Sequence, residues 1–338
     1  MEMAKIKEIV AAMTLEEKAG MCSGEDFWHT KAVERLGIPK IMVSDGPHGL
    51  RKQDENGDNP GVNDSIKAVC FPAGCGAATS FNRDLIYEMG KSLGKECQSE
   101  NVSVLLGPAV NIKRSPLCGR NFEYYSEDPY LASEIAASHI NGVQSMGVGT
   151  SIKHFMANNQ ETRRMSVSAS IDERALHEIY LAVFENAIKK SKPWTVMSSY
   201  NKVNGRYVGE NYELMTDFLR KESGFDGFVM SDWGAVGNRV AGLKAGLDLE
   251  MPGSQGVRDA LIVEAVKNGS MEESTLNTAC ERILNIVYKA VENHDSSIKV
   301  SWDDEHDKSR MIAEETIVLL KNQDDICLLY TSPSPRDS

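Results

Sequence analysis

The chain has 338 residues, enough for two domains of ordinary size or for one large α/β barrel. Hydrophobic residues make up 41% and charged residues 25%, which excludes a disordered chain, and no apolar run approaches the ~18 residues that a membrane span needs. Lys and Arg number 37 against 49 Asp and Glu, a formal charge of -12. We therefore expect no nucleic-acid or membrane partner, because both require a positive surface, and a neutral or cationic ligand fits better.

The first residues predict a helix rather than a targeting segment. Residues 1–13 mix charges with Ile6, Ile9, Val10 and Met13 at helical spacing, and they lack the apolar stretch and cleavage site of a secretory signal. Seven cysteines, an odd number without a C-x-x-C pair, favour reduced thiols over a disulfide framework. Both observations indicate a cytoplasmic protein.

Short apolar runs recur along the chain, and amphipathic stretches with helical spacing lie between them. The runs cover residues 41–44, 102–106, 150–154, 195–199, 228–231 and 247–250, with a weaker one near Val69. Helices are expected between them, for example over 84–97, 131–145 and 172–190. This alternation predicts an α/β fold with a parallel sheet, and its extent favours a (β/α)8 TIM-type barrel. An open doubly wound sheet is the alternative, but the glycine fingerprint expected at its first turn is absent.

The end of the chain changes character. Residues 307–320 predict one more helix, and after Lys321 and Asn322 the sequence passes abruptly into ICLLYTSPSPRDS. We interpret this tail as a processing scar similar to translated adapter sequence, with native sequence ending near Ile326. An ordinary disordered terminus is the alternative.

Polar residues follow several predicted strands. Asp45 and Arg51 follow the first run, Lys153 and His154 end another, and Tyr200 and the Asp232-Trp233 pair follow later runs. In a parallel barrel these ends converge on the face that carries the active site. Each residue alone also has a structural explanation: a turn at Asp45, a solvated lysine, a core histidine, a helix cap at Asp232. Their shared position favours a site.

This set of side chains suits a polyhydroxylated ring. Charged groups form strong hydrogen bonds to hydroxyls, and an aromatic ring covers the apolar face of a sugar. The sequence has no H-E-x-x-H, no EF-hand loop and no clustered His/Cys set, so we expect no metal and no cofactor. The absence of G-x-S-x-G argues against a serine hydrolase.

Eight motifs in order carry a resemblance to a known family. They are SDGPHGLR (44–51), FPAGCGAATSFN (71–82), LLGPAVNIKRSPLCGRNFEYYSEDP (105–129), SIKHFMANNQETRR (151–164), IDERALHEIYL (171–181), VMSSYNKVNG (196–205), GFVMSDWGA (227–235) and GLDLEMPG (246–253). Over residues 5–322 the chain resembles glycoside hydrolase family 3, in particular its β-glucosidase branch. The resemblance implies that Asp232 is the nucleophile and that the sugar is held by Asp45, Arg51, Arg120, Lys153, His154, Arg164 and Tyr200, with Trp233 stacking beside the nucleophile.

A retaining mechanism on this resemblance needs an ionised nucleophile. We expect the lysine, histidine and arginine side chains to keep Asp232 deprotonated, and Asp45 to accept hydrogen bonds from hydroxyls. Hydrogen bonds to the ring would hold its anomeric carbon against Asp232 as oxocarbenium character develops.

The second carboxyl group of a retaining mechanism is not assigned within the chain. In the β-glucosidases that the chain resembles, the acid/base is a Glu of a following α/β sandwich domain. Glu123, Glu127, Glu161 and Glu250 lie in the matched motifs, but the resemblance gives none of them this role. We therefore expect a barrel domain over 1–296, a linker and helix over 297–326 that leads into a missing sandwich domain, and a non-native tail over 327–338.

Other activities of the same family stay open. The β-N-acetylglucosaminidase branch is disfavoured because KHFMANNQETRR lacks that branch's proline-glycine and its second His or Asp position. A β-xylosidase or α-L-arabinofuranosidase is the alternative enzyme, and Asp45, expected to bind outer hydroxyls of glucose, favours the β-glucosidase. A sugar-binding fragment with little turnover is the non-enzymatic alternative.

Overall fold

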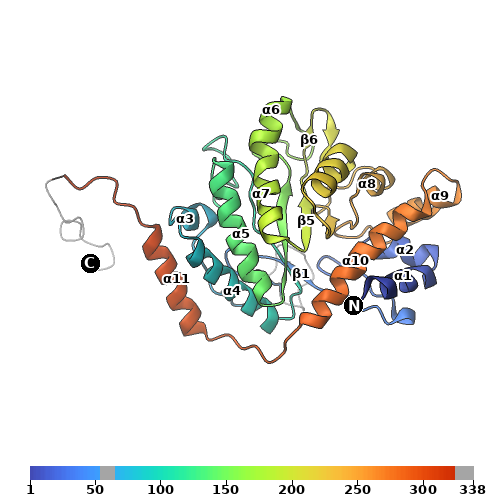
Figure 1. Ribbon diagram of the computed structural model, residues 1–338, viewed down its shortest axis with the longest axis horizontal. Coiled ribbons are helices and arrows are strands. Elements are labelled where there is room, and N and C mark those ends of the chain that lie inside the picture. The colour runs from blue at the N-terminus through green and yellow to red at the C-terminus, as the bar shows by residue number, and fades with distance from the viewer. Residues whose placement is uncertain (54–64, 324–338) are drawn as a thin grey trace.

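A parallel sheet forms the centre of the computed structural model, which describes residues 1–53 and 65–323 (Figure 1). Its strands lie in the order β1-β2-β3-β5-β8. They are β1 (Val43–Asp45), β2 (Val104–Leu106), β3 (Gly149–Phe155), β5 (Thr195–Ser198) and β8 (Phe228–Met230). Strands thus overlap five of the expected apolar runs, and every neighbouring pair is parallel.

Isolated bridges continue the sheet from β8 back to β1. Met230 pairs in parallel with Leu249, and Glu250 pairs in parallel with Ser23. Two antiparallel bridges complete the path, Gly24 to Thr30 and His29 to Met42, the residue before β1. The ladder therefore returns to its first strand as in a barrel. It departs from a regular (β/α)8 barrel because the turn around residues 24–30 makes one contributor antiparallel.

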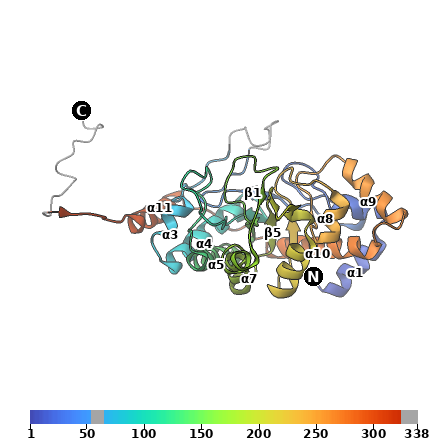
Figure 2. The ribbon, with the colours of Figure 1, turned by 90° about the horizontal axis from the view of Figure 1, so that it is seen from above.

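Helices flank the sheet, and α4 and α7 pack on either side of α5 (Figures 1 and 2). Asn82, Asp128 and Asp172 begin α4, α5 and α6, because their side chains accept hydrogen bonds from amides of the first turn. The helices are α1 (Met3–Ala12), α2 (Leu15–Met21), η1 (Glu34–Leu36), α3 (Gly74–Ala78), α4 (Arg83–Ser99), α5 (Pro129–Ser145), α6 (Glu173–Ala175), η2 (Leu176–Leu181), α7 (Ala182–Ser191), η3 (Val208–Glu210), η4 (Glu213–Glu222), α8 (Arg239–Ala245), α9 (Val257–Lys267), α10 (Glu273–Asn293) and α11 (Trp302–Thr316).

A small second sheet lies apart from the central one. It contains β4 (Ser168–Ala169), β6 (Lys202–Val203) and β7 (Arg206–Tyr207), in the order β4-β6-β7. Strands β4 and β6 are parallel, and β6 and β7 form an antiparallel hairpin. This sheet connects the segment that follows β3 to the segment that follows β5.

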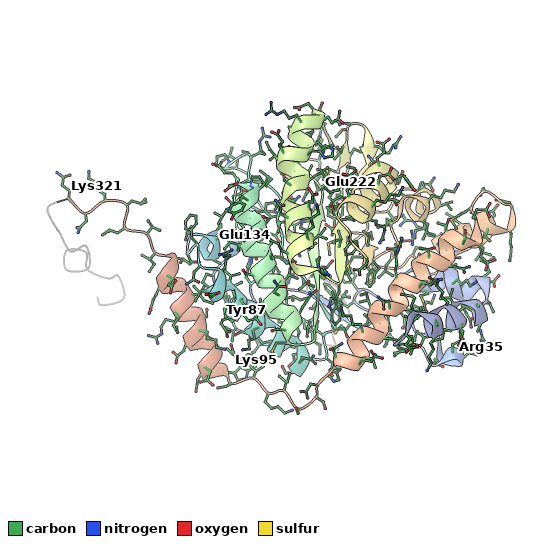
Figure 3. All side chains as sticks on the ribbon, viewed as in Figure 1. Arg35, Tyr87, Lys95, Glu134, Glu222 and Lys321 are labelled. Atoms are coloured by element: carbon green, nitrogen blue, oxygen red, sulfur yellow. The ribbon has the colours of Figure 1, made fainter. Side chains whose placement is uncertain are left out.

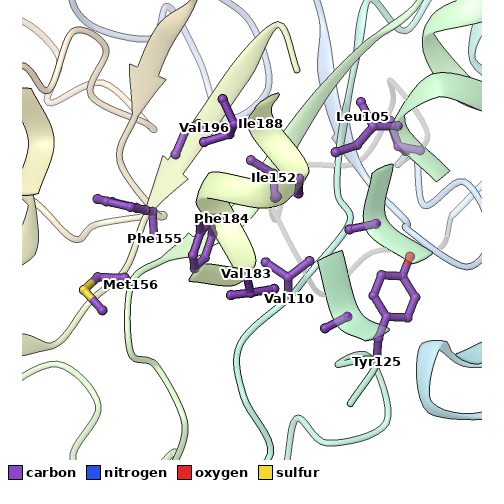
Figure 4. Close-up of a cluster of buried hydrophobic side chains, with 14 of the residues drawn as sticks. Leu105, Val110, Tyr125, Ile152, Phe155, Met156, Val183, Phe184, Ile188 and Val196 are labelled. Carbon is purple, nitrogen blue, oxygen red and sulfur yellow. The ribbon is translucent and has the colours of Figure 1, made fainter. Parts of the chain in front are cut away.

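Two apolar clusters fill the space on opposite faces of the central sheet. Along β2, Leu105 belongs to one cluster, and Val104 and Leu106 belong to the other, because successive side chains of a strand point to opposite faces. The first cluster lies beneath α5 and α7, where Phe155 and Phe184 meet edge to face at 5.1 Å between ring centroids (Figure 4). Burial on both faces explains why the strands are nearly continuous apolar runs.

Three segments were predicted from the sequence with different success: the run near Val69, the last helix and the C-terminal tail. The residues around Val69 form no strand, although Val69 is buried. Helix α11 ends at Thr316 rather than near residue 320, and the exposed stretch 317–320 leads to Lys321, away from the barrel (Figure 3). The expected non-native tail, 327–338, lies outside the described residues. Within the described ranges, no helix has both the length and the apolar character to cross a membrane.

Candidate active site

A cavity of about 210 Å³ opens where the central strands end. All predicted site residues except Arg51 line it, together with residues that the sequence did not single out. The lining residues are Phe27, Trp28, Asp45, Leu106, Arg120, Lys153, His154, Arg164, Met197, Tyr200, Asp232 and Trp233. The strand ends therefore converge as expected, and the structural explanations weighed for each residue alone do not account for their common cavity.

Asp232 follows β8 and is buried in the wall of this cavity. Its Oδ1 accepts a hydrogen bond from the Trp233 amide at 2.7 Å, whereas its Oδ2 has no hydrogen-bond partner among the described residues. The Nε2 atom of His154 lies 3.7 Å from Oδ2. A buried carboxylate oxygen without a partner is costly, so this atom is poised to contact a ligand.

The pKa of Asp232 runs against our expectation. Burial raises this pKa above its ordinary value, and the Trp233 amide, the Tyr200 hydroxyl and the charges of Arg120 and Lys153 offset the effect only in part. Burial is the largest cause, and the nearby cations lower this pKa without outweighing it. Both cations also have carboxylate partners of their own: Lys153 contacts Asp45 at 2.7 Å, and Arg120 contacts Glu123.

Asp45 and Lys153 form the second charged pair of the cavity. The Lys153 side chain is buried and donates from Nζ to Asp45 Oδ1, while Arg51 lies 3.8 Å from Oδ2. Burial would raise the pKa of Asp45, but the charges of Lys153 and Arg51 hold it below its ordinary value. Asp45 is therefore an ionised acceptor. Arg51 is more than half exposed and lines an adjoining cavity of about 580 Å³, which shares Asp45 and Arg120 with the first.

His154 is buried and contacts two polar side chains. Its Nε2 is 2.9 Å from Nη2 of Arg120, and its Nδ1 is 3.3 Å from Oδ1 of Asn111. Burial and the charges of Arg120, Lys153 and Arg164 lower the pKa of His154 well below its ordinary value, so the ring is neutral. Asn111 was not identified from the sequence, although it lies in one of the matched motifs.

Aromatic rings form the remaining wall. Trp28 and Trp233 lie 5.5 Å apart between ring centroids, and Phe27 lies 6.1 Å from Trp233. The indole of Trp233 donates to the Phe27 carbonyl at 2.9 Å, and the Tyr200 hydroxyl donates to the Trp233 carbonyl at 3.0 Å. The guanidinium of Arg164 stacks 4.5 Å from the Tyr200 ring centre. The sequence placed Trp233 here but missed Phe27 and Trp28, which lie in the turn that completes the barrel.

No third carboxylate among the described residues lines the cavity beside Asp45 and Asp232. Three of the glutamates of the matched motifs contact arginines: Glu123 with Arg120, Glu161 with Arg164, and Glu250 with Arg258. Glu127 does not line this cavity. Within the same described ranges, no three His, Cys, Asp or Glu side chains gather in a group that could hold a metal ion.

A barrel with carboxylates, cations and aromatic rings at the carboxyl ends of its strands is built like the catalytic barrels of glycoside hydrolases. The chain belongs to glycosyl hydrolase family 3: the model of the N terminal domain of this family matches residues 15–286.

The sequence similarity to two named glycosidases agrees with this family membership. The chain is 60% identical to thermostable beta-glucosidase B of Acetivibrio thermocellus over 97% of its own length and 43% of the relative's. It is 48% identical to an exo-alpha-(1->6)-L-arabinopyranosidase of Bifidobacterium longum over 96% of the chain and 43% of that protein. The chain thus spans less than half the length of these relatives.

Solved structures show the same fold. Beta-glucosidase 3B of Thermotoga neapolitana, in complex with alpha-D-glucose, superposes with a TM-score of 0.89 at 43% identity, over 95% of this chain and 48% of that one. A family 3 beta-glucosidase of Bifidobacterium adolescentis gives a TM-score of 0.88 at 48% identity, over 94% and 45%.

Proposed function

We propose that this chain supplies the nucleophile and the sugar-binding cavity of a retaining β-glucosidase, which releases terminal non-reducing β-D-glucosyl residues. The observation that carries the proposal is Asp232 Oδ2, a buried carboxylate oxygen that has no hydrogen-bond partner within residues 1–53 and 65–323 and lies in a cavity lined by Lys153, Arg120 and Trp233. The relatives named as beta-glucosidases support the substrate class.

The chemistry assigns one role to each part of the cavity. Asp232 Oδ2 attacks the anomeric carbon and forms a glycosyl ester while the bond to the leaving oxygen breaks. The ring hydroxyls are held by Asp45, Lys153, Arg120, His154, Arg164 and Tyr200, and Trp233 covers an apolar sugar face. Arg51 acts from the adjoining cavity, where it lies 3.8 Å from Asp45. Water then cleaves the ester and regenerates Asp232.

The leaving oxygen requires a proton from an acid that we assign outside this chain. Asp45 is a poor candidate, because Lys153 and Arg51 stabilise its ionised form. The relatives extend well beyond the matched part, which is consistent with an acid/base carboxyl in a following domain. On this proposal residues 1–296 form the barrel domain, 297–326 lead into the next domain, and 327–338 are non-native. A cytoplasmic location is part of the proposal, supported by cysteines that are all free among the described residues.

A second substrate class has a specific basis. The relative from Bifidobacterium longum is an arabinopyranosidase at 48% identity, so a pentopyranoside is a competing substrate. Comparing kcat/KM for nitrophenyl β-D-glucoside, β-D-xyloside and α-L-arabinopyranoside, in a protein that contains this chain and supports turnover, decides between them. A preference for either pentoside by more than about tenfold would replace the glucosidase assignment.

Covalent trapping tests the nucleophile on this chain directly. A 2-deoxy-2-fluoroglucosyl fluoride carries a leaving group that needs little protonation, so Asp232 should be labelled without the external acid. Peptide mapping by mass spectrometry should find the sugar on Asp232, and the Asp232→Asn variant should stay unlabelled. A label on another carboxylate, or none on folded chain, would refute the proposal as stated.

A further inference from the structure

The contacts of Asn111 determine which nitrogen of His154 carries a proton. The Asn111 side chain pairs with the backbone of His154: its Nδ2 donates to the His154 carbonyl at 2.9 Å, and its Oδ1 accepts from the His154 amide at 2.9 Å. An amide N–H can only donate and a carbonyl can only accept. The two backbone contacts therefore fix the orientation of the Asn111 side chain.

The fixed orientation of the Asn111 side chain also determines the protonation of the imidazole ring. The same Oδ1 lies 3.3 Å from Nδ1 of His154, and an amide oxygen cannot donate, so Nδ1 must carry the hydrogen. In a neutral ring Nε2 then carries no hydrogen and can only accept a hydrogen bond. Nε2 faces Nη2 of Arg120 at 2.9 Å, and a guanidinium has only donors, so the assignment agrees at both ring nitrogens.

The ring is almost entirely shielded from solvent. His154 is 1% exposed and Asn111 is equally buried. The charged groups around the ring are Arg120, Lys153 and Arg164, all cations, together with Asp232 at 3.7 Å from Nε2. The three cations disfavour an imidazolium, so the neutral ring is the stable form.

We propose that Asn111 is a positioning residue that locks His154 in its neutral Nδ1–H tautomer, so that bare Nε2 accepts a hydrogen bond from Arg120 and holds this guanidinium in the cavity of Asp232. The proposal extends the glycosidase assignment on which its catalytic consequence rests. It also changes the role of His154, which presents an acceptor, and never a donor, to Arg120 or to a sugar hydroxyl.

Nitrogen NMR of the chain labelled with ¹⁵N-histidine tests the tautomer without any activity. The His154→Gln variant identifies the signals of His154 by their loss. We expect a protonated Nδ1 and an unprotonated Nε2 at about pH 7. A protonated Nε2, in either the other tautomer or an imidazolium, would overturn the proposal.

Asn111→Asp sharpens the test. A carboxylate at this position stabilises positive charge on the ring, so both nitrogens of His154 should become protonated, and Nε2 could no longer accept from Arg120. Asn204→Asp is the matched control, because Asn204 pairs with the backbone of Ile171 in the same way, at 2.9 Å for both contacts, with no histidine involved. The control should leave the His154 signals unchanged. Unchanged His154 signals in folded Asn111→Asp would contradict the proposal.

The labelling rate with the fluoroglucosyl fluoride gives the catalytic consequence. Loss of a hydrogen bond to a charged group corresponds to about a ten- to 150-fold slower reaction in Asn111→Asp, and to little change in Asn204→Asp. If the unmodified chain shows the expected tautomer but takes no label, the glycosidase assignment fails while the role of Asn111 toward His154 stands. If labelling occurs at the same rate in Asn111→Asp, the positioning role fails alone.

Discussion

Asp232 and Asp248 are both buried aspartates near β8, but their surroundings are opposite. Asp248 accepts hydrogen bonds from Arg220 at 2.5 Å, from the Val229 amide at 2.8 Å and from Arg282 at 3.0 Å, so both of its oxygens are satisfied. Asp232 accepts from the Trp233 amide, and its other oxygen has no partner among the described residues. The fold completes the charge pairing where the barrel needs stability and leaves it incomplete where a ligand can complete it.

Replacement of Asp232 by Asn should give the largest effect on activity. An amide cannot form the glycosyl ester, so in a protein that contains this chain and supports turnover we expect a loss of several powers of ten in kcat, beyond the roughly 10²–10⁴ of general acid–base groups. The melting temperature should change little, because Oδ2 loses no hydrogen bond to any residue that the structure describes. Steady-state kinetics and thermal unfolding check both parts, with Asp217→Asn at a partly exposed position as the control. Near-normal turnover in purified Asp232→Asn would exclude it as the nucleophile.

Replacement of Asp248 by Asn should affect stability instead. Removing one charge from a buried ion network leaves Arg220 and Arg282 without compensation, which costs about 3–5 kcal/mol in the free energy of unfolding. Urea unfolding followed by circular dichroism measures this loss. If Asp248→Asn unfolds like the unmodified chain, the contrast between the two aspartates does not reflect stability.

Replacement of Lys153 by Ala should have an intermediate effect on catalysis. Lys153 donates to Asp45 and lines the cavity, so its loss removes a charged hydrogen bond worth about 1.5–3 kcal/mol, or ten- to 150-fold in kcat/KM. Kinetics on a β-glucoside, together with the melting temperature, separate this loss from unfolding. Unchanged kinetics in a variant that melts far earlier would assign Lys153 to the core.

The smallest expected effect is on the pH dependence of labelling, on the acidic side of the profile. Asp232 must be ionised to attack, and burial raises its pKa, so the labelling rate should fall with decreasing pH around a midpoint above the ordinary Asp value of about 3.9. Removing the charge of Lys153, which lowers the pKa of Asp232, should move this midpoint to higher pH. Labelling rates at a series of pH values measure the midpoint. A midpoint at or below the ordinary value would mean that the cations outweigh burial.

The features that depend on the recurring pattern of apolar runs and helical spacing were predicted well from the sequence. The strands overlap the apolar runs. Asp45 ends β1, Lys153 lies in the second half of β3 and Asp232 follows β8, so the convergence of the site followed from the alternation of strands and helices. The motifs added Arg120 and Arg164, which lie in loops where periodicity carries no information. Arg51 came with the same motif as Asp45 but lies in the adjoining cavity.

Three features could not be read from the sequence because they depend on the pairing of distant side chains. Phe27 and Trp28 lie in a turn whose bridges are single residue pairs, too short for an alternating pattern. The raised pKa of Asp232 depends on how deeply the folded chain buries this carboxyl group, which outweighs the charges of Arg120 and Lys153. Val69 is an apolar residue buried within a loop, and its amide donates to Glu96 on α4 instead of entering a sheet.

The turn that completes the barrel also bears on how the protein folds. Phe27 and Trp233 meet in the cavity wall although 206 residues separate them along the chain. Contacts between such distant residues form slowly, because a long loop must close before the contact stabilises it. During synthesis the hydrogen bond between the Phe27 carbonyl and the Trp233 indole cannot form until the segment that carries Trp233 has emerged from the ribosome. The cavity is a late product of folding, and ligand binding to a nascent or refolding chain reports that the first and last parts of the barrel have met.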